Sequence, residues 1–184
     1  SAASDVYKRQ DPTAWENIAV RCAAQFGNGE ILKLLLDLAL ERGVDPAADD
    51  NYAIRYAAEN GHTDIVRLLL DLPLGRGVDP TTMNNCVIRR AAMYGRAGVV
   101  QLLLALPSTR AVDPASDDNC AIRWAAENGH ADVVQLLIDL PLEHGVDPAA
   151  VNNLSLIHIS EPTRPLYISY AVFCLKKDIS CIGV

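Results

Sequence analysis

Histidines and paired carboxylates, the side chains most able to do chemistry in this chain, recur at corresponding positions. His62 and His130 each follow a glycine, and carboxylate pairs occur at 49–50 and 117–118. Two imidazoles could bind a metal ion, and two neighbouring carboxylates could share a proton in acid–base chemistry. These residues are therefore the first candidates for a metal site or a catalytic centre.

Neither group is complete enough for a metal site or a catalytic centre. The places 34 residues before and after His62 hold Asn28 and Arg96, so no ligand set continues along the chain. We expect these side chains to bond to loop backbone, and the carboxylate pairs to be solvated turn residues. No phosphate-binding glycine loop or nucleophile elbow occurs in the repeated region. The sequence predicts no enzyme, no cofactor and no metal.

Arginine occupies one position in every copy of this interval: Arg21, Arg55, Arg89 and Arg123. One interpretation is a basic ladder for an acidic ligand. The other is a scaffold role, in which each guanidinium bonds to carbonyls or aspartates of adjoining loops. We favour the scaffold role, because surface positions that select a partner usually differ between copies.

The element that must position these residues is a 34-residue repeat. The segment 51–80 recurs almost intact as 119–148, and Asp-Pro pairs begin at Asp11, Asp45, Asp79, Asp113 and Asp147. A fixed period of this length is typical of a solenoid.

Each copy is predicted to contain two helices. Small apolar residues from Ala53 to Ala58 have helical spacing, and Gly61 would end that short first helix. Thr63-Asp64 could cap a second, leucine-rich helix that is apolar nearly all round and must be buried between neighbours. Proline at 73, 107 and 141 should stop this helix, whereas the first copy has Ala39 there and is expected to continue further.

The segments AAENGHTDIVRLLL and AAENGHADVVQLLI resemble the helix, glycine turn and leucine helix of the ankyrin repeat family. The resemblance covers 11–153 and implies an all-α, elongated and curved solenoid of four stacked helix-turn-helix repeats. Their bounds would be 11–44, 45–78, 79–112 and 113–146, with a fifth beginning at 147. The family's Thr-Pro-Leu-His opening is replaced by 18–21, 52–55, 86–89 and 120–123, each ending in arginine, and the family period is about 33. The loops that follow are therefore expected to differ from the usual β-hairpin.

The two ends of the chain fit no repeat position. Residues 1–10 resemble the translation of a synthetic transposase adapter used to prepare sequencing libraries, and residues 154–159 resemble the translation of its complementary strand. The segment 168–177 resembles a translated flow-cell adapter. We expect 1–10 and 154–184 to be adapter-derived and to make no essential contribution to the native fold.

Composition narrows the class of partner. Residues 11–153 contain 11 Lys and Arg and 20 Asp and Glu, a formal charge of 11 − 20 = −9, which disfavours nucleic acid. The apolar segment 166–175 is about half the length that a membrane span needs. Cys86 and Cys120 occupy one position in adjacent copies, too far apart for a disulfide if repeats stack about 8 to 10 Å apart. We expect free thiols, a cytoplasmic or otherwise intracellular monomer, and a protein partner that presents a basic patch.

Positions whose residue type varies between copies are the predicted binding residues. They lie at the ends of the first helices (Tyr56, Glu59, Arg90, Met93, Tyr94, Trp124 and Glu127) and in the loops (Asp49, Asp50, Met83, Asn84, Asp117 and Asp118). Aromatic residues, methionine and arginine are enriched at protein interfaces. The predicted function is a protein-interaction module that binds on its concave and loop face. The alternative is a targeting or regulatory array of a larger enzyme or channel whose other domains are missing.

Overall fold

The computed structural model describes residues 13–147, except the side chains of residues 14, 38–41, 74 and 142. This part of the chain is helical and contains no strand. The first helix of each pair is α2 (Ala14–Gln25), α4 (Ala48–Asn60), α6 (Thr82–Met93) or α8 (Ser116–Glu127). The second is α3 (Gly29–Arg42), α5 (Thr63–Leu70), α7 (Ala97–Leu104) or α9 (Ala131–Ile138). Short 3₁₀ turns occur at Leu74–Arg76 (η1) and Leu142–His144 (η2).

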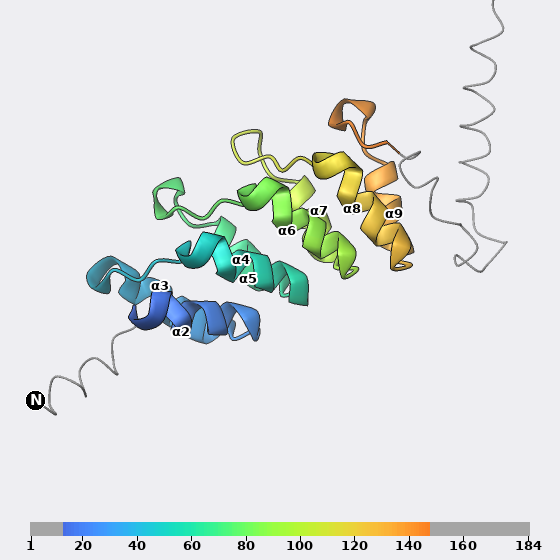
Figure 1. The fold of residues 1–184 in the computed structure, drawn as a ribbon. Helices are drawn as coiled ribbons and strands as arrows, with labels where there is room; N and C mark the ends of the chain where they lie inside the picture. Colours follow the sequence, from blue (N-terminus) through green and yellow to red (C-terminus); the bar gives the residue numbers. More distant parts are fainter. Residues whose placement is uncertain (1–12, 148–184) are drawn as a thin grey trace, which may run out of the picture. The chain divides into compact units, whose positions relative to one another are not determined.

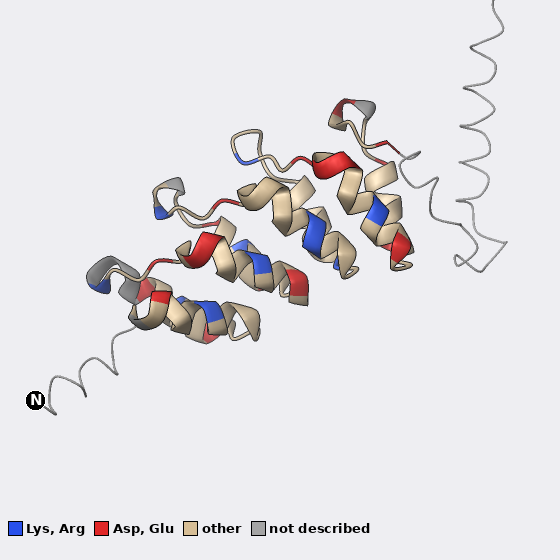
Figure 2. Cartoon of the chain, viewed as in Figure 1, with Lys and Arg blue, Asp and Glu red and all other residues tan. Residues whose placement is uncertain are grey.

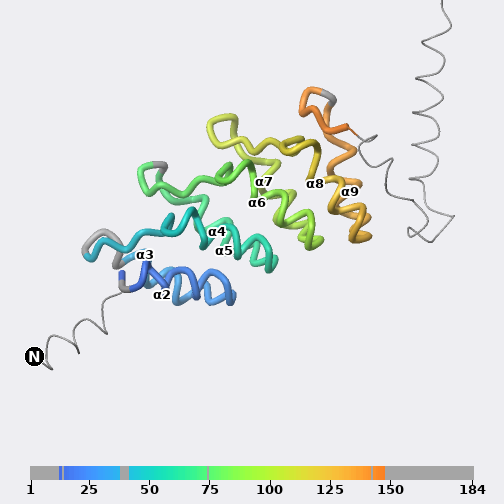
Figure 3. The backbone as a smooth tube through the Cα atoms, in the orientation of Figure 1, coloured from blue at the N-terminus to red at the C-terminus, as the bar shows by residue number. Residues whose placement is uncertain are grey.

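The four helix pairs stack in chain order (Figure 1). The first helices form one row, in which α2 packs on α4, α4 on α6, and α6 on α8. In the second row α5 packs on α7, and α7 on α9. The loops after the second helices project to the same side of the stack (Figure 3). The prediction of an all-α solenoid built from helix-turn-helix repeats is confirmed. Residues 1–10 and 154–184 lie outside the described residues.

Each first helix ends at a glycine, as predicted. Gly61 follows α4 with φ +79°, a left-handed conformation that costs glycine little. The next amide then reaches back, so that His62 N–H donates to the Ala57 carbonyl at 2.9 Å. The equivalent bond from Arg96 to Ala91 is 2.8 Å long. This tight turn brings the second helix back along the first.

The start of each first helix contains a feature that the sequence analysis missed. Three consecutive residues adopt left-handed backbone angles before the right-handed helix continues: 15–17, 49–51, 83–85 and 117–119. The φ values of these residues lie between +50° and +62°. This conformation costs an ordinary L-residue roughly 1–2 kcal/mol, and asparagine and aspartate tolerate it best. The composition of Asp49-Asp50-Asn51 and Asp117-Asp118-Asn119 follows from this requirement. We call these segments the left-handed turns.

The second helices supply most of the large buried side chains. In α5 the side chains of Ile65, Val66, Leu69 and Leu70 are buried, which confirms that this helix lies between neighbours. The helices α5, α7 and α9 end before their prolines, whereas α3 continues through Ala39 to Arg42, as predicted. The predicted side-chain cap is wrong, because the Thr63 hydroxyl bonds to the Gly61 carbonyl instead. The N-cap position is His62, and it makes no side-chain cap bond.

Candidate interaction surface

A column of asparagines joins each repeat to the next. The third residue of every left-handed turn is an asparagine whose side-chain oxygen accepts the backbone N–H of the Asp in the following Asp-Pro pair. Asn51 accepts from Asp79, and Asn85 from Asp113, both at 2.9 Å. Asn17 and Asn119 make the same bond, also at 2.9 Å. These side chains hold the connecting loops against the starts of the first helices, so they belong to the scaffold.

The histidines also bridge repeats. His62 Nε2 lies 3.1 Å from the Gln25 carbonyl, and His130 Nε2 lies 3.0 Å from the Met93 carbonyl. Arg96 takes the same role, since its Nε donates to the Glu59 carbonyl at 2.9 Å. The expectation that these side chains bond to loop backbone is confirmed. Among residues 13–147, no group of three or more histidine, cysteine or acidic side chains could hold a metal ion.

The repeated arginines bond to the left-handed turns. Arg55 donates to the Asp49 carbonyl and Arg89 to the Met83 carbonyl, both at 3.0 Å. Arg123 bonds to the Asp118 carbonyl at 3.3 Å. These contacts confirm that the arginines bond to turn carbonyls, which anchors each left-handed turn to its own helix.

Two of these arginines also pair with a carboxylate of the next repeat. Arg21 lies 3.3 Å from a carboxylate oxygen of Asp49 and also reaches Glu16. Arg89 pairs with Asp117. The ion pairs confirm the predicted contacts with aspartates of adjoining loops.

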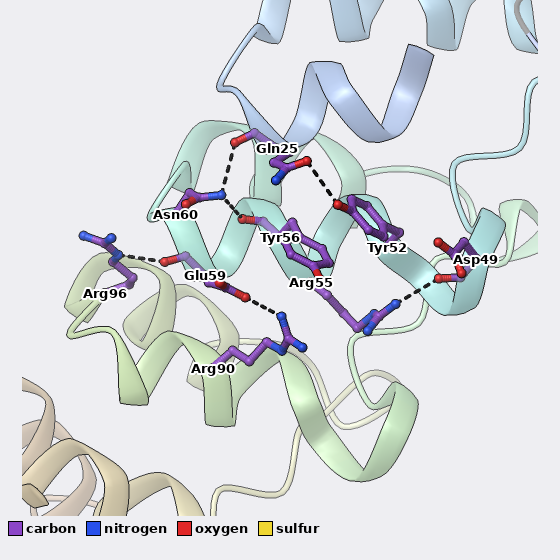
Figure 4. A network of polar contacts seen from close by, with 9 residues as sticks. All are labelled: Gln25, Asp49, Tyr52, Arg55, Tyr56, Glu59, Asn60, Arg90 and Arg96. Carbon is purple, nitrogen blue, oxygen red and sulfur yellow. Dashed lines mark hydrogen bonds and ion pairs between the residues drawn. The ribbon is translucent and has the colours of Figure 1, made fainter. Parts of the chain in front are cut away.

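Tyrosine and arginine side chains stack between the second and third repeats (Figure 4). The rings of Tyr52 and Tyr56 lie 4.0 Å apart and nearly parallel, as expected for residues one helical turn apart. The guanidinium of Arg21 lies 4.6 Å from the Tyr52 ring, and that of Arg90 lies 5.0 Å from the Tyr56 ring. Burial, with the neighbouring Tyr56 hydroxyl, raises the pKa of Tyr52. We call Arg21, Tyr52, Tyr56 and Arg90 the tyrosine–arginine cluster.

Arg90 forms an ion pair with Glu59 across the α4–α6 contact. Burial opposes the charge on Arg90, but bonds to the Tyr56 hydroxyl and to Glu59 raise the pKa of its guanidinium. Tyr52 also reaches the preceding repeat, because its hydroxyl bonds to Gln25 Oε1 at 3.1 Å. This part of the surface is therefore an ordered polar network that spans three repeats (Figure 4).

The predicted loop residues all lie in the left-handed turns. Their side chains are exposed and alternate in charge along the stack: acidic at 49–50, neutral at 83–84 and acidic again at 117–118. Figure 2 shows red at the starts of α4 and α8 and tan at the start of α6. The turns thus present a row of positions with a fixed backbone and variable side chains.

The predicted residues on the first helices divide into two groups. Tyr56, Glu59 and Arg90 contact one another and are half-buried. At the end of α6, Tyr94 is 43% exposed, while Met93 is half-buried. On α8, half-buried Trp124 lies under Arg89, with its ring 5.8 Å from the guanidinium, and Glu127 is exposed. The exposed members are therefore Tyr94 and Glu127.

The sequence analysis missed three contributors to this surface. The asparagine column was detectable, because Asn17, Asn51, Asn85 and Asn119 are 34 residues apart. Tyr52 was detectable from its spacing to Tyr56. Arg110 was not, since it is one residue in a loop, yet it bonds to the carbonyls of Leu70, Leu72 and Val78 in the preceding repeat.

The cysteines in the described part of the chain are free thiols, as predicted. Cys120 is buried, and burial raises the pKa of its thiol. Within residues 13–147, no helix is long and apolar enough to cross a membrane.

Comparison with known families agrees with the geometry. A model of ankyrin repeats in three copies matches residues 4–84, and a single ankyrin repeat model matches residues 117–153. A search of curated proteins found no match to the chain. Ankyrin repeats generally bind other proteins. Stacked helix pairs, glycine turns and buried leucine helices, together with these two matches, show that the chain belongs to the ankyrin repeat family.

Proposed function

We propose that this array binds a protein partner on the face formed by its first helices and left-handed turns. One observation carries the proposal. Side chains that repeat in every copy, such as Asn51 and Arg55, are occupied by contacts that hold the scaffold together. Side chains that vary between copies, such as Met83 and Tyr94, remain exposed on the same face. A fixed frame with variable exposed positions is what a recognition surface requires.

The chemistry of the exposed positions favours a protein ligand. Tyr94 and Met83 are of the types enriched in interface cores, whereas the acidic turns at 49–50 and 117–118 would form a charged rim. Rim carboxylates should accelerate encounter with a basic partner surface, and this effect should weaken as salt rises. Free thiols and the absence of nucleic-acid features fit a binding protein in a reducing compartment of the cell.

Site-specific photo-cross-linking tests this surface. A photoreactive amino acid is placed at Tyr94 on α6 or, as the matched control, at Gln101, an exposed position on α7. In lysate of the source organism, a discrete adduct from position 94 but not from position 101 supports the proposal. Adducts from position 101 alone would move the binding surface to the second helices.

A further inference from the structure

Arg55 differs from the other repeated arginines in lacking a carboxylate partner. In the first and third repeats, the arginine pairs with the first residue of the next left-handed turn: Arg21 with Asp49 and Arg89 with Asp117. The equivalent residue for Arg55 is Met83, 28 positions later. Among the described residues, no carboxylate forms an ion pair with Arg55.

The environment of Arg55 makes this difference costly. The residue is 8% exposed, and its guanidinium donates one hydrogen bond, to the Asp49 carbonyl at 3.0 Å. The Tyr52 and Tyr56 rings each lie 5.9 Å away, at the outer limit of a cation–π contact. A buried guanidinium that has lost most of its hydration gains from a hydrogen-bonded carboxylate. The protein supplies this carboxylate in the repeats before and after, but not here.

The turn at 83–85 leaves room for a carboxylate from another molecule. Met83 is 53% exposed and uncharged, and its flexible thioether side chain can be displaced at little cost. The neighbouring turn residue, Asn84, is also exposed and uncharged. An incoming carboxylate would therefore meet no charge repulsion from this turn.

The neighbouring turns specify what should flank that carboxylate. Acidic pairs lie one repeat before, at 49–50, and one repeat after, at 117–118, as the red segments on α4 and α8 show (Figure 2). Packed helices lie about 8 to 10 Å apart, and an extended chain advances about 3.3 Å per residue. About three residues of an extended ligand therefore span one repeat.

We propose that the array recognises a protein segment that inserts an aspartate or glutamate beside Arg55 at the Met83 turn, with lysine or arginine three residues away on both sides. The central carboxylate completes the arginine column where the protein's own carboxylate is missing. The flanking basic residues face the acidic turns. This inference rests on the proposed function, since it names the ligand chemistry of the same face.

A synthetic peptide tests the proposal on the full chain. The probe has a central glutamate, lysines three residues away on each side, glycine and serine elsewhere, blocked ends and a fluorophore. A comparison peptide has glutamine in place of glutamate. Fluorescence anisotropy at low salt should show that the glutamate peptide binds about tenfold more tightly or better, since the pairing adds a charge-assisted hydrogen bond.

Two variants identify the site. Met83→Asp restores the internal carboxylate, so it should abolish the preference for glutamate over glutamine and raise the melting temperature. Met83→Leu is the matched control, because it removes the thioether without adding charge and should keep the preference. Aspartate already occupies this backbone conformation at positions 49 and 117, so Met83→Asp is expected to fold.

Each other outcome contradicts the inference. Equal binding of the two peptides, no binding of either, or a glutamate preference that survives in Met83→Asp would each show that Arg55 does not receive a ligand carboxylate. The proposed function is tested separately by cross-linking from position 94. A positive cross-link combined with a failed peptide test would leave the binding face in place and overturn only the ligand chemistry.

Discussion

The side-chain oxygen of Asn51 accepts the backbone N–H of Asp79 at 2.9 Å, and Asn51 itself has a φ of +62°. One residue therefore performs two tasks: it adopts the left-handed conformation that ends the turn, and it ties the loop of the next repeat to this one. The bond recurs in every described repeat.

Replacing Asn51 should separate these two tasks. Asn51→Ala loses the bond and disfavours the left-handed conformation, so we expect a loss of about 1 to 3 kcal/mol in the free energy of unfolding. Asn51→Gly loses the bond but keeps the conformation accessible, so it should cost less. Urea denaturation measures both. Equal stability of Asn51→Ala and wild type would show that the asparagine column is not part of the scaffold.

The glycine turns allow a matched comparison of backbone strain and packing. Gly95 and Gly129 both have positive φ, at +67° and +76°, but a Cβ at Gly95 would lie 2.5 Å from His130 Nδ1, whereas a Cβ at Gly129 would meet nothing within 4 Å. Both alanine variants should lose stability because of the left-handed backbone. Gly95→Ala should lose more, because the His130 ring must move. The thermal unfolding of the two variants tests this, and a larger loss in Gly129→Ala would contradict it.

Stability should fall at alkaline pH partly through Cys120. Burial raises the pKa of this thiol in the folded protein, so the unfolded chain releases the proton first, near its ordinary pKa of about 8.5. The contribution of Cys120 is therefore complete below that pH and is lost as pH rises towards the folded pKa. Urea unfolding of the protein and of Cys120→Ala from pH 7 to 10 should show a smaller pH dependence in the variant. An unchanged pH dependence would assign the effect to other groups.

The fold could be predicted from sequence because its signals are periodic. A constant interval of 34 residues, the glycine after each first helix and the leucines of each second helix fixed the helix pairs and their stacking. The contacts of the histidines and repeated arginines also followed, since identical residues in a stack meet identical backbone groups. Even the longer α3 was visible in Ala39, which replaces a helix-ending proline.

Other features depend on three-dimensional details that periodicity does not encode. Left-handed angles at 49–51 leave only a weak trace in composition, because aspartate and asparagine are common in ordinary turns too. The half-burial of Arg90 results from its pairing with Glu59 on another helix, and that pairing depends on the distance between α4 and α6. The missing carboxylate at Arg55 emerges only when the ion pairs of adjacent repeats are compared.

Core and surface positions should respond differently to truncation. Leu69 is fully buried, so Leu69→Ala should lower the free energy of unfolding by about 2 to 5 kcal/mol. Tyr94 is 43% exposed at the end of α6, so Tyr94→Ala should change thermal stability little. Calorimetry of the two variants compares them. A Tyr94→Ala protein as unstable as Leu69→Ala would mean that Tyr94 supports the fold.

The central claim, that the first helices and left-handed turns bind a protein partner, is tested most directly by equilibrium titration. Once cross-linking from position 94 has identified the partner, its affinity is measured for wild type, Tyr94→Ala and Arg67→Ala, the last an exposed α5 position that serves as control. Tyr94→Ala should weaken binding by about 1 to 3 kcal/mol, while Arg67→Ala should match wild type. Wild-type affinity in a folded Tyr94→Ala protein, with a loss in Arg67→Ala, would contradict the claim.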